Sequence, residues 1–224
     1  MITVHHLNNS RSQRVLWALE ELKIPYQVKH YERDPKTNLA PEQLKQVHPL
    51  GKSPVITDGE KMIAESGAII EYLSETYGDS SFIPAVKSSS YWQYKYWLHF
   101  SEGTMMPQLL LALIFKKIVA RSLPFIVKPI AKGIAKKVMD GYVLKNIGDN
   151  LALIEIHLKE NEWFAGDTLT GADIQMSFPL EAWASQNKHN PSYPTIIAYV
   201  KRIQNRPAYQ KALQVGGAYD YANI

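Results

Sequence analysis

The chain of 224 residues contains no cysteine and no long uninterrupted apolar run. Without thiols it can form no disulfide, no thiolate metal site and no cysteine nucleophile. The longest purely apolar run, residues 109–115, is far shorter than the about 20 residues that a membrane-spanning helix needs. No charged segment followed by a long apolar run opens the sequence, so we expect a cytoplasmic protein without a signal peptide. Any thiol chemistry must use a thiol that a ligand brings.

The 12 glycines and 13 prolines are too few for a fibrous chain. Apolar residues make up 46% and charged residues 21%, a composition typical of a globular protein with a sizeable core. The seven histidines show no metal-ligand spacing, so we expect no metal site.

Negative charge is nearly missing from residues 116–145, although the whole chain is only mildly basic. The 25 Lys and Arg against 21 Asp and Glu give a net charge of +4, whereas this segment has eight cationic residues against Asp140 alone, or +7. Such an amphipathic basic segment favours weak contact with an anionic membrane surface or an anionic ligand. The alternative is a solvated helix face with a loop around Pro124 and Pro129. No nucleic-acid module accompanies the segment, so we expect no nucleic-acid partner.

The first 77 residues alternate strand-like and helical patterns in the order β-α-β-α-β-β-α. The first two strands are expected to be parallel around a crossover helix, and Asp58-Gly59 between two short apolar runs predicts a hairpin. Residues 1–78 are therefore a predicted α/β domain. The expected strands are 2–7, 26–31, 53–57 and 61–63, and the expected helices are 15–22, 42–47 and 65–76.

A polar linker, residues 79–90, separates this domain from the rest of the chain. Residues 91–224 show helical periodicity with almost no strand signal, which predicts an all-α domain. Thr170-Gly171-Ala172-Asp173 is a capping box, a local folding signal to which we assign no chemistry. The expected helices are 91–120, 127–160, 172–187, 193–205 and 207–214.

Three polar sites are expected at one end of the predicted sheet. Ser10 lies where the first strand turns into the first helix, Ser53 precedes Pro54 at a strand start, and Glu65-Ser66 begins a helix. Helix N-termini and free hydroxyls bind anions, although each site taken alone is also consistent with ordinary helix capping or an ordinary proline. Together they predict a groove for an extended, peptide-like anion with carboxylates at its ends.

The sequence resembles a known family, the cytosolic glutathione transferases. The resemblance rests on His48-Pro-Leu-Gly-Lys-Ser-Pro-Val-Ile and Ala64-Glu-Ser-Gly-Ala-Ile-Ile-Glu-Tyr-Leu. The opening segment from Val4 to Trp17 is similar to the bacterial and fungal branch. This resemblance covers essentially the whole chain and implies a thioredoxin-like N-terminal domain followed by an all-α domain.

The resemblance also implies roles for individual residues toward glutathione. Ser53, before a cis Pro54, would pair its backbone with the cysteinyl part, and Lys52 would lie near the glycyl carboxylate. Ser66 would take the γ-glutamyl carboxylate, and Glu65 would face the ammonium group.

The residue that activates the thiol is expected in the turn after the first strand. Ser10 is the favoured donor, because a hydroxyl that bonds a thiolate lowers the pKa of the thiol. Asn9 stands where serine-type relatives have their serine, counting back from Val15, so its amide is an alternative. Ser12 is a third choice, and Arg11 adds positive charge.

An electrophile pocket is expected between the domains, on the first helix of the second domain. Its predicted residues are Tyr94, Trp97, Phe100 and Met105, although aromatic residues at helical spacing are also typical of a core.

The resemblance implies an enzyme, a homodimeric glutathione S-transferase that detoxifies small hydrophobic electrophiles with glutathione as co-substrate and without a metal. Peroxidase activity on organic hydroperoxides is a possible addition. The alternative is a non-catalytic binding or scaffold protein of the same fold.

Overall fold

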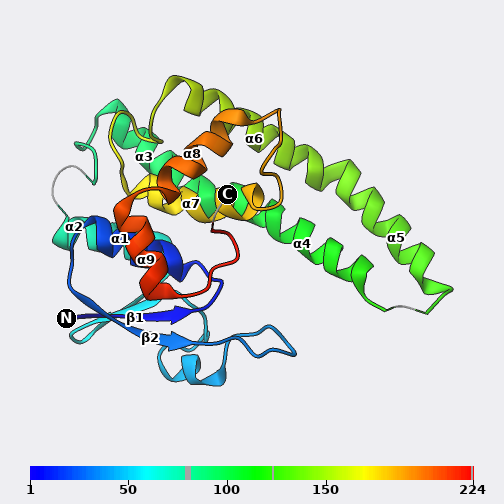
Figure 1. The fold of residues 1–224 in the computed structure, drawn as a ribbon, viewed down its shortest axis with the longest axis horizontal. Coiled ribbons are helices and arrows are strands. Elements are labelled where there is room, and N and C mark those ends of the chain that lie inside the picture. The colour runs from blue at the N-terminus through cyan, green and yellow to red at the C-terminus, as the bar shows by residue number, and fades with distance from the viewer. Residues whose placement is uncertain (79–81, 123, 223) are drawn as a thin grey trace.

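In the computed structural model we describe residues 1–78, 82–122, 124–222 and 224. The N-terminal part is a four-stranded sheet in the order β2-β1-β3-β4 (Figure 1). β1 runs parallel to β2 and antiparallel to β3, and β3 and β4 form the expected hairpin. The bounds are β1 Ile2–Leu7, β2 Tyr26–Tyr31, β3 Val55–Asp58, β4 Lys61–Ala64, α1 Ser12–Glu21 and α2 Ser66–Tyr77. The β-α-β-α-β-β-α prediction is confirmed except that the second helix is a short 3₁₀ segment, Glu42–Gln46.

The rest of the described chain is helical, as predicted. Its bounds are α3 Ser89–Phe100, α4 Met106–Ala120, α5 Val127–Val138, α6 Leu144–Glu160, α7 Gly171–Ala184, α8 Pro194–Gln204 and α9 Pro207–Gly216. Two of the expected long helices contain a π-helical turn, Ser101–Met105 between α3 and α4 and Met139–Val143 between α5 and α6. The predicted linker falls partly on residues 79–81, which lie outside the described residues.

The two parts share one hydrophobic core. Helix α1 packs against both α9 and α7, so its apolar face is buried between the sheet and the helical bundle. Val15, Leu16 and Trp17 are fully buried there. At about 25 cal/mol per Å² of apolar surface, burial of this face contributes several kcal/mol to the stability of the domain contact.

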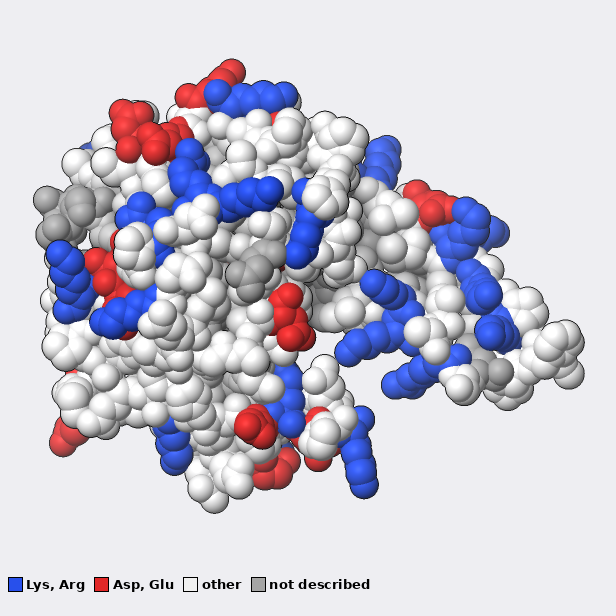
Figure 2. All heavy atoms as spheres, viewed as in Figure 1, with Lys and Arg blue, Asp and Glu red and all other residues white. Residues whose placement is uncertain are grey.

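Helices α4 and α5 form a hairpin that projects from the body, and we call residues 106–138 the arm (Figure 1). Near its tip Phe125 is 92% exposed and Ile126 is 78% exposed. Lys and Arg side chains gather on the arm, several of them projecting into the hollow between arm and body (Figure 2). By length and composition, the continuous helical run 89–120 also passes as a membrane span, although its first part packs against α7 within the bundle.

Candidate functional site

The three predicted polar sites lie where β1 ends, β3 begins and β4 ends. Val55 pairs with Ala64, so Pro54 and Glu65 flank the same end of the hairpin. The Ser53 hydroxyl donates to the His5 carbonyl at 2.8 Å and accepts from the Leu7 N–H at 3.3 Å. The Ser53-Pro54 peptide bond is cis, as the resemblance implied. Among the described residues, no hydrogen bond uses the main-chain N–H or C=O of Ser53, which leaves both groups available to an extended ligand.

Ser66 lies at the first turn of α2 and is buried. Its hydroxyl oxygen accepts from Nη2 of Arg14 at 2.8 Å and from Nε2 of Gln175 at 3.4 Å. Because the oxygen acts as acceptor in both bonds, the hydroxyl proton remains free to donate to an anion at this helix N-terminus. Glu65 is exposed and has a φ of +69°, a conformation that non-glycine residues rarely adopt.

The turn after β1 carries the four candidate activators. Asn9 has a φ of +49° and its side-chain amide is held by the C-terminal tail. Its Nδ2 donates to a carboxylate oxygen of Asp220 at 2.9 Å, and its Oδ1 accepts from the Asp220 N–H at 2.8 Å. Nδ2 carries two N–H groups and the clamp uses one of them. The second remains available to a ligand.

Ser10 and Ser12 belong to a buried hydrogen-bond chain that ends on His6. The Ser10 and Ser12 hydroxyl oxygens lie 2.7 Å apart, and the Ser12 oxygen lies 2.9 Å from Nδ1 of His6. Ser10 also accepts from the Ser12 N–H at 3.2 Å. The serine oxygens thus hold the first turn of α1 against β1.

His6, at the end of this hydrogen-bond series, has a shifted pKa. Burial lowers the pKa of His6 to about 4, with a smaller contribution from His30, while a hydrogen bond to the Gly216 backbone opposes the shift. The imidazole is therefore neutral at pH 7 and carries one N–H. The Ser12 O–H has two acceptors within reach, Nδ1 of His6 at 2.9 Å and the Leu7 carbonyl at 3.3 Å, and the Ser10 hydroxyl bonds Ser12. Both serine hydroxyls are therefore engaged inside the protein, and Ser10 is only 5% exposed.

Arg11 and Arg14 converge on Glu102, which the π-helical turn presents toward α1. Nε of Arg11 lies 2.9 and 3.0 Å from the two carboxylate oxygens, and Nη2 of buried Arg14 also pairs with Glu102. Burial alone would raise the pKa of Glu102, but the guanidiniums of Arg14 and Arg11 hold it below its ordinary value. Single π-helical turns often occur at functional sites, and this one supplies the counter-ion for two cations.

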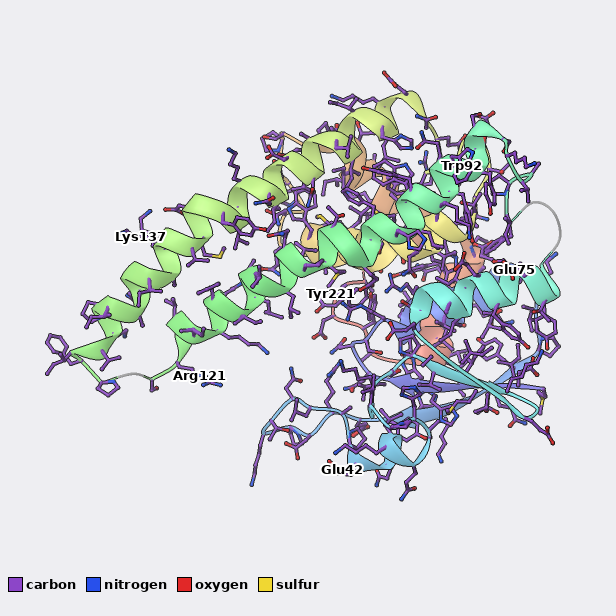
Figure 3. All side chains as sticks on the ribbon, turned by 180° about the vertical axis from the view of Figure 1, so that it is seen from behind. Glu42, Glu75, Trp92, Arg121, Lys137 and Tyr221 are labelled. Carbon is purple, nitrogen blue, oxygen red and sulfur yellow. The ribbon has the colours of Figure 1, made fainter. Side chains whose placement is uncertain are left out.

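A cavity of about 960 Å³ lies between the arm and the body and includes Asn9 and Arg11 in its wall. Its apolar surface comes from α4 and α7, with Met106, Leu109 and Phe178 as examples. Tyr221 of the C-terminal tail lines it where the arm meets the body (Figure 3).

The residues predicted for an electrophile pocket do not line this cavity. Their side chains are buried in the main hydrophobic core, and the α4 residues further along the chain line the cavity instead. The four buried residues are Tyr94, Trp97, Phe100 and Met105.

Two family models match the chain. The family described as "Glutathione S-transferase, N-terminal domain" matches residues 1–75, and "Glutathione S-transferase, C-terminal domain" matches residues 117–207. The chain belongs to the glutathione S-transferase family.

Full-length relatives agree with this assignment. Glutathione S-transferase 3 of Schizosaccharomyces pombe is 37% identical, with 96% of this chain and 87% of that protein covered. Glutathione S-transferase 1 of Saccharomyces cerevisiae is 31% identical, with 98% of both chains covered. A crystal structure of a glutathione S-transferase from Actinobacillus pleuropneumoniae superposes with a TM-score of 0.83 at 37% identity, covering 100% of this chain and 97% of the other. A more distant match, a probable elongation factor 1-gamma 2 of Arabidopsis thaliana, is 27% identical over 79% of this chain and 40% of that protein.

Sequence reasoning missed several residues around the candidate site. Asp220 and Gly216 gave no signal because they lie more than 200 residues from their partners, Asn9 and His6. Arg14 carried a weak signal, since an arginine on the apolar face of a helix needs a buried partner. Among the described residues, no group of three or more His, Asp or Glu side chains is arranged to hold a metal ion.

Proposed function

We propose that this chain is an active glutathione transferase in which the Asn9 amide, rather than the Ser10 hydroxyl, stabilises the glutathione thiolate. One observation carries the proposal. Asn9 lines the cavity with one N–H free, whereas Ser10 is buried, does not line the cavity and bonds Ser12 in the hydrogen-bond series that ends on His6. A donor that bonds the charged form lowers the thiol pKa and so raises the fraction of nucleophile at neutral pH.

The residues at this end of the sheet fit glutathione. Ser66 offers a hydroxyl proton backed by the positive charge of Arg14, which suits the γ-glutamyl carboxylate. Ser53 offers an unpaired main chain to the cysteinyl part, and exposed Lys52 supplies charge for the glycyl carboxylate. Exposed Glu65 can face the ammonium group. These positions and roles are those that the family resemblance implied.

The chemistry follows from the thiolate. In conjugation, its sulfur forms a bond to an electrophilic carbon, while a leaving group departs or a neighbouring atom takes a proton. With an organic hydroperoxide, the sulfur attacks the peroxide oxygen and releases an alcohol, and a second glutathione converts the sulfenic acid to oxidised glutathione and water. The chain's own contribution is the same in both reactions: it holds the thiolate and shields one face from water.

A scaffold protein is the second candidate, because the fold also occurs in the elongation factor relative. Residues available to glutathione favour the enzyme, since a scaffold has no use for an unpaired Ser53 main chain or a free Ser66 proton. The proposal includes a homodimeric, cytoplasmic detoxification enzyme. It also includes weak contact of residues 116–145 with an anionic membrane surface.

The deciding experiment measures glutathione binding by calorimetry together with turnover of 1-chloro-2,4-dinitrobenzene and cumene hydroperoxide. An enzyme binds glutathione and accelerates at least the conjugation. Binding without turnover of either substrate would favour the scaffold, and absence of binding would contradict the proposed site.

A further inference from the structure

The cavity between arm and body is cationic as well as apolar. Its wall contains five cationic residues against a single acidic one, Asp220. The five are Arg11, Arg33, Lys116, Lys132 and Lys136. A cleft that combines apolar walls with one sign of charge concentrates amphipathic ions of the opposite sign.

The five cations are not equally available. Arg11 is paired with Glu102, and Lys136 is paired with Asp140. Lys116 has only the amide oxygen of Gln186 at 3.0 Å, and neither Lys116 nor Lys132 has a carboxylate within ion-pair distance among the described residues. Arg33 also has no carboxylate partner among the described residues, but its guanidinium is held by the main-chain carbonyls of Asn8, Asn9 and Asn38. Lys116 and Lys132 lie on the arm, away from the turn that holds Asn9.

Asp220, the acidic residue of the cavity wall, lies at the end of the cavity remote from these two lysines. Asp220 is bound to Asn9, next to the position proposed for the thiolate. The reacting carbon of a second substrate must lie at this end, beside the thiolate, so the end of the substrate remote from that carbon lies toward the arm. There Lys116 and Lys132 are the cations without a carboxylate partner.

The distance between the two ends is set by α4. Ten residues separate Met106 from Lys116, which corresponds to about 15 Å of helix at 1.5 Å per residue. The side chains between them that line the cavity are mainly apolar, for example Leu109, Leu113 and Phe115. This length accommodates an extended aliphatic chain of medium length.

We propose that the cavity selects amphipathic anions, namely electrophiles with an aliphatic chain and a carboxylate or similar group at the end remote from the reacting carbon. Lys116 and Lys132 hold the anionic end. The proposal rests on the proposed transferase function for its reaction, but the binding of the anion does not depend on catalysis.

The test compares two straight-chain enones that differ only at the end remote from the double bond. One ends in a carboxylate and the other in a carboxamide, so the intrinsic reactivity toward glutathione is the same. We expect a higher kcat/KM for the carboxylate, and we expect added salt to reduce this preference.

The variants provide a matched control. Lys116→Gln with Lys132→Gln removes two charges that face the cavity, and Lys117→Gln with Lys137→Gln removes two charges from the same helices outside it. The first pair should reduce the ratio of the two kcat/KM values about fivefold, as expected for two partly exposed ion pairs. The second pair should leave the ratio within twofold of the unmodified protein.

Calorimetry with decanoate and decanamide provides a readout without turnover. Tighter binding of decanoate that is lost in the first double variant supports the proposal even if no enone is converted, in which case only the transferase function fails. Equal binding and equal turnover of the two compounds would overturn the proposal. An equal loss of preference in both double variants would also overturn it, since the effect would then come from net charge.

Discussion

The side-chain amide of Asn9 is clamped by Asp220 through two hydrogen bonds, of 2.9 and 2.8 Å. The clamp fixes which way the amide points, and it leaves the second N–H of Nδ2 for a ligand. The C-terminal tail thereby becomes part of the site in the first turn after β1.

Asp220 is thus predicted to act as a positioning residue. Asp220→Ala should reduce kcat about tenfold or more, since a misdirected donor costs roughly one to three orders of magnitude in comparable sites. KM for glutathione should change little, because Asp220 does not contact the residues proposed for its carboxylates. Asp220→Asn keeps an acceptor oxygen and should recover most of the activity. Equal losses in both variants would contradict the positioning role.

The His6 environment predicts a pH-dependent stability. The pKa of His6 is about 4 in the folded protein against 6.5 for an unperturbed histidine. The unfolded state therefore binds the proton first, and the stability that His6 contributes is complete above pH 6.5 and lost as the pH falls to about 4. The difference corresponds to at most about 3 kcal/mol.

Urea unfolding at several pH values measures this effect. His6→Gln should flatten the dependence of the unfolding free energy on pH between 4 and 6.5. A variant that keeps the full slope would show that other groups, such as His5, cause it.

Arg14 is predicted to support Ser66 through its guanidinium rather than through charge alone. Arg14→Lys keeps the charge but cannot reach Ser66, Glu102 and Gln175 together. We expect a loss of stability of about 3 kcal/mol, because buried Arg14 partners are left unsatisfied. KM for glutathione should rise more than kcat falls. An unchanged KM in the folded variant would argue against a role of Ser66 at the carboxylate.

The exposed tip of the arm predicts binding to anionic vesicles. Phe125 and Ile126 can insert at the interface while nearby lysines contact the headgroups. The fraction of the protein that sediments with phosphatidylserine vesicles should decrease at high salt. The double variant Phe125→Asp with Ile126→Asp should abolish this co-sedimentation. Binding to neutral vesicles alone, or no binding, would leave the tip a solvated surface.

Much of the fold was predictable, because strand alternation, the Asp58-Gly59 turn and helical periodicity are local signals. The 3₁₀ segment and the two π-helical turns were not, since tertiary contacts such as those of Glu102 set them. The burial of Tyr94 and Trp97 in the core was not predictable for the same reason: helical spacing shows that a face is apolar and does not show which neighbour it meets.

The position of Ser53, Glu65 and the first turn at one end of the sheet was predictable from strand order. The proposed preference for Asn9 over Ser10 was not predictable. It depends on Asp220 in the tail, which holds the Asn9 amide, and on the burial of Ser10 beside Ser12 and His6. Contacts across such separations leave no local pattern in a single sequence.

The most direct test of the account is a titration of the ultraviolet thiolate absorbance of bound glutathione in Asn9→Gly and Ser10→Ala. A glycine at position 9 adopts the φ of +49° without strain, so Asn9→Gly removes the side-chain amide without changing the backbone. We predict that Asn9→Gly raises the thiol pKa by about one unit or more, toward that of a free thiol, while Ser10→Ala loses stability and leaves the thiol pKa unchanged. A raised thiol pKa in Ser10→Ala together with an unchanged one in Asn9→Gly would contradict the account.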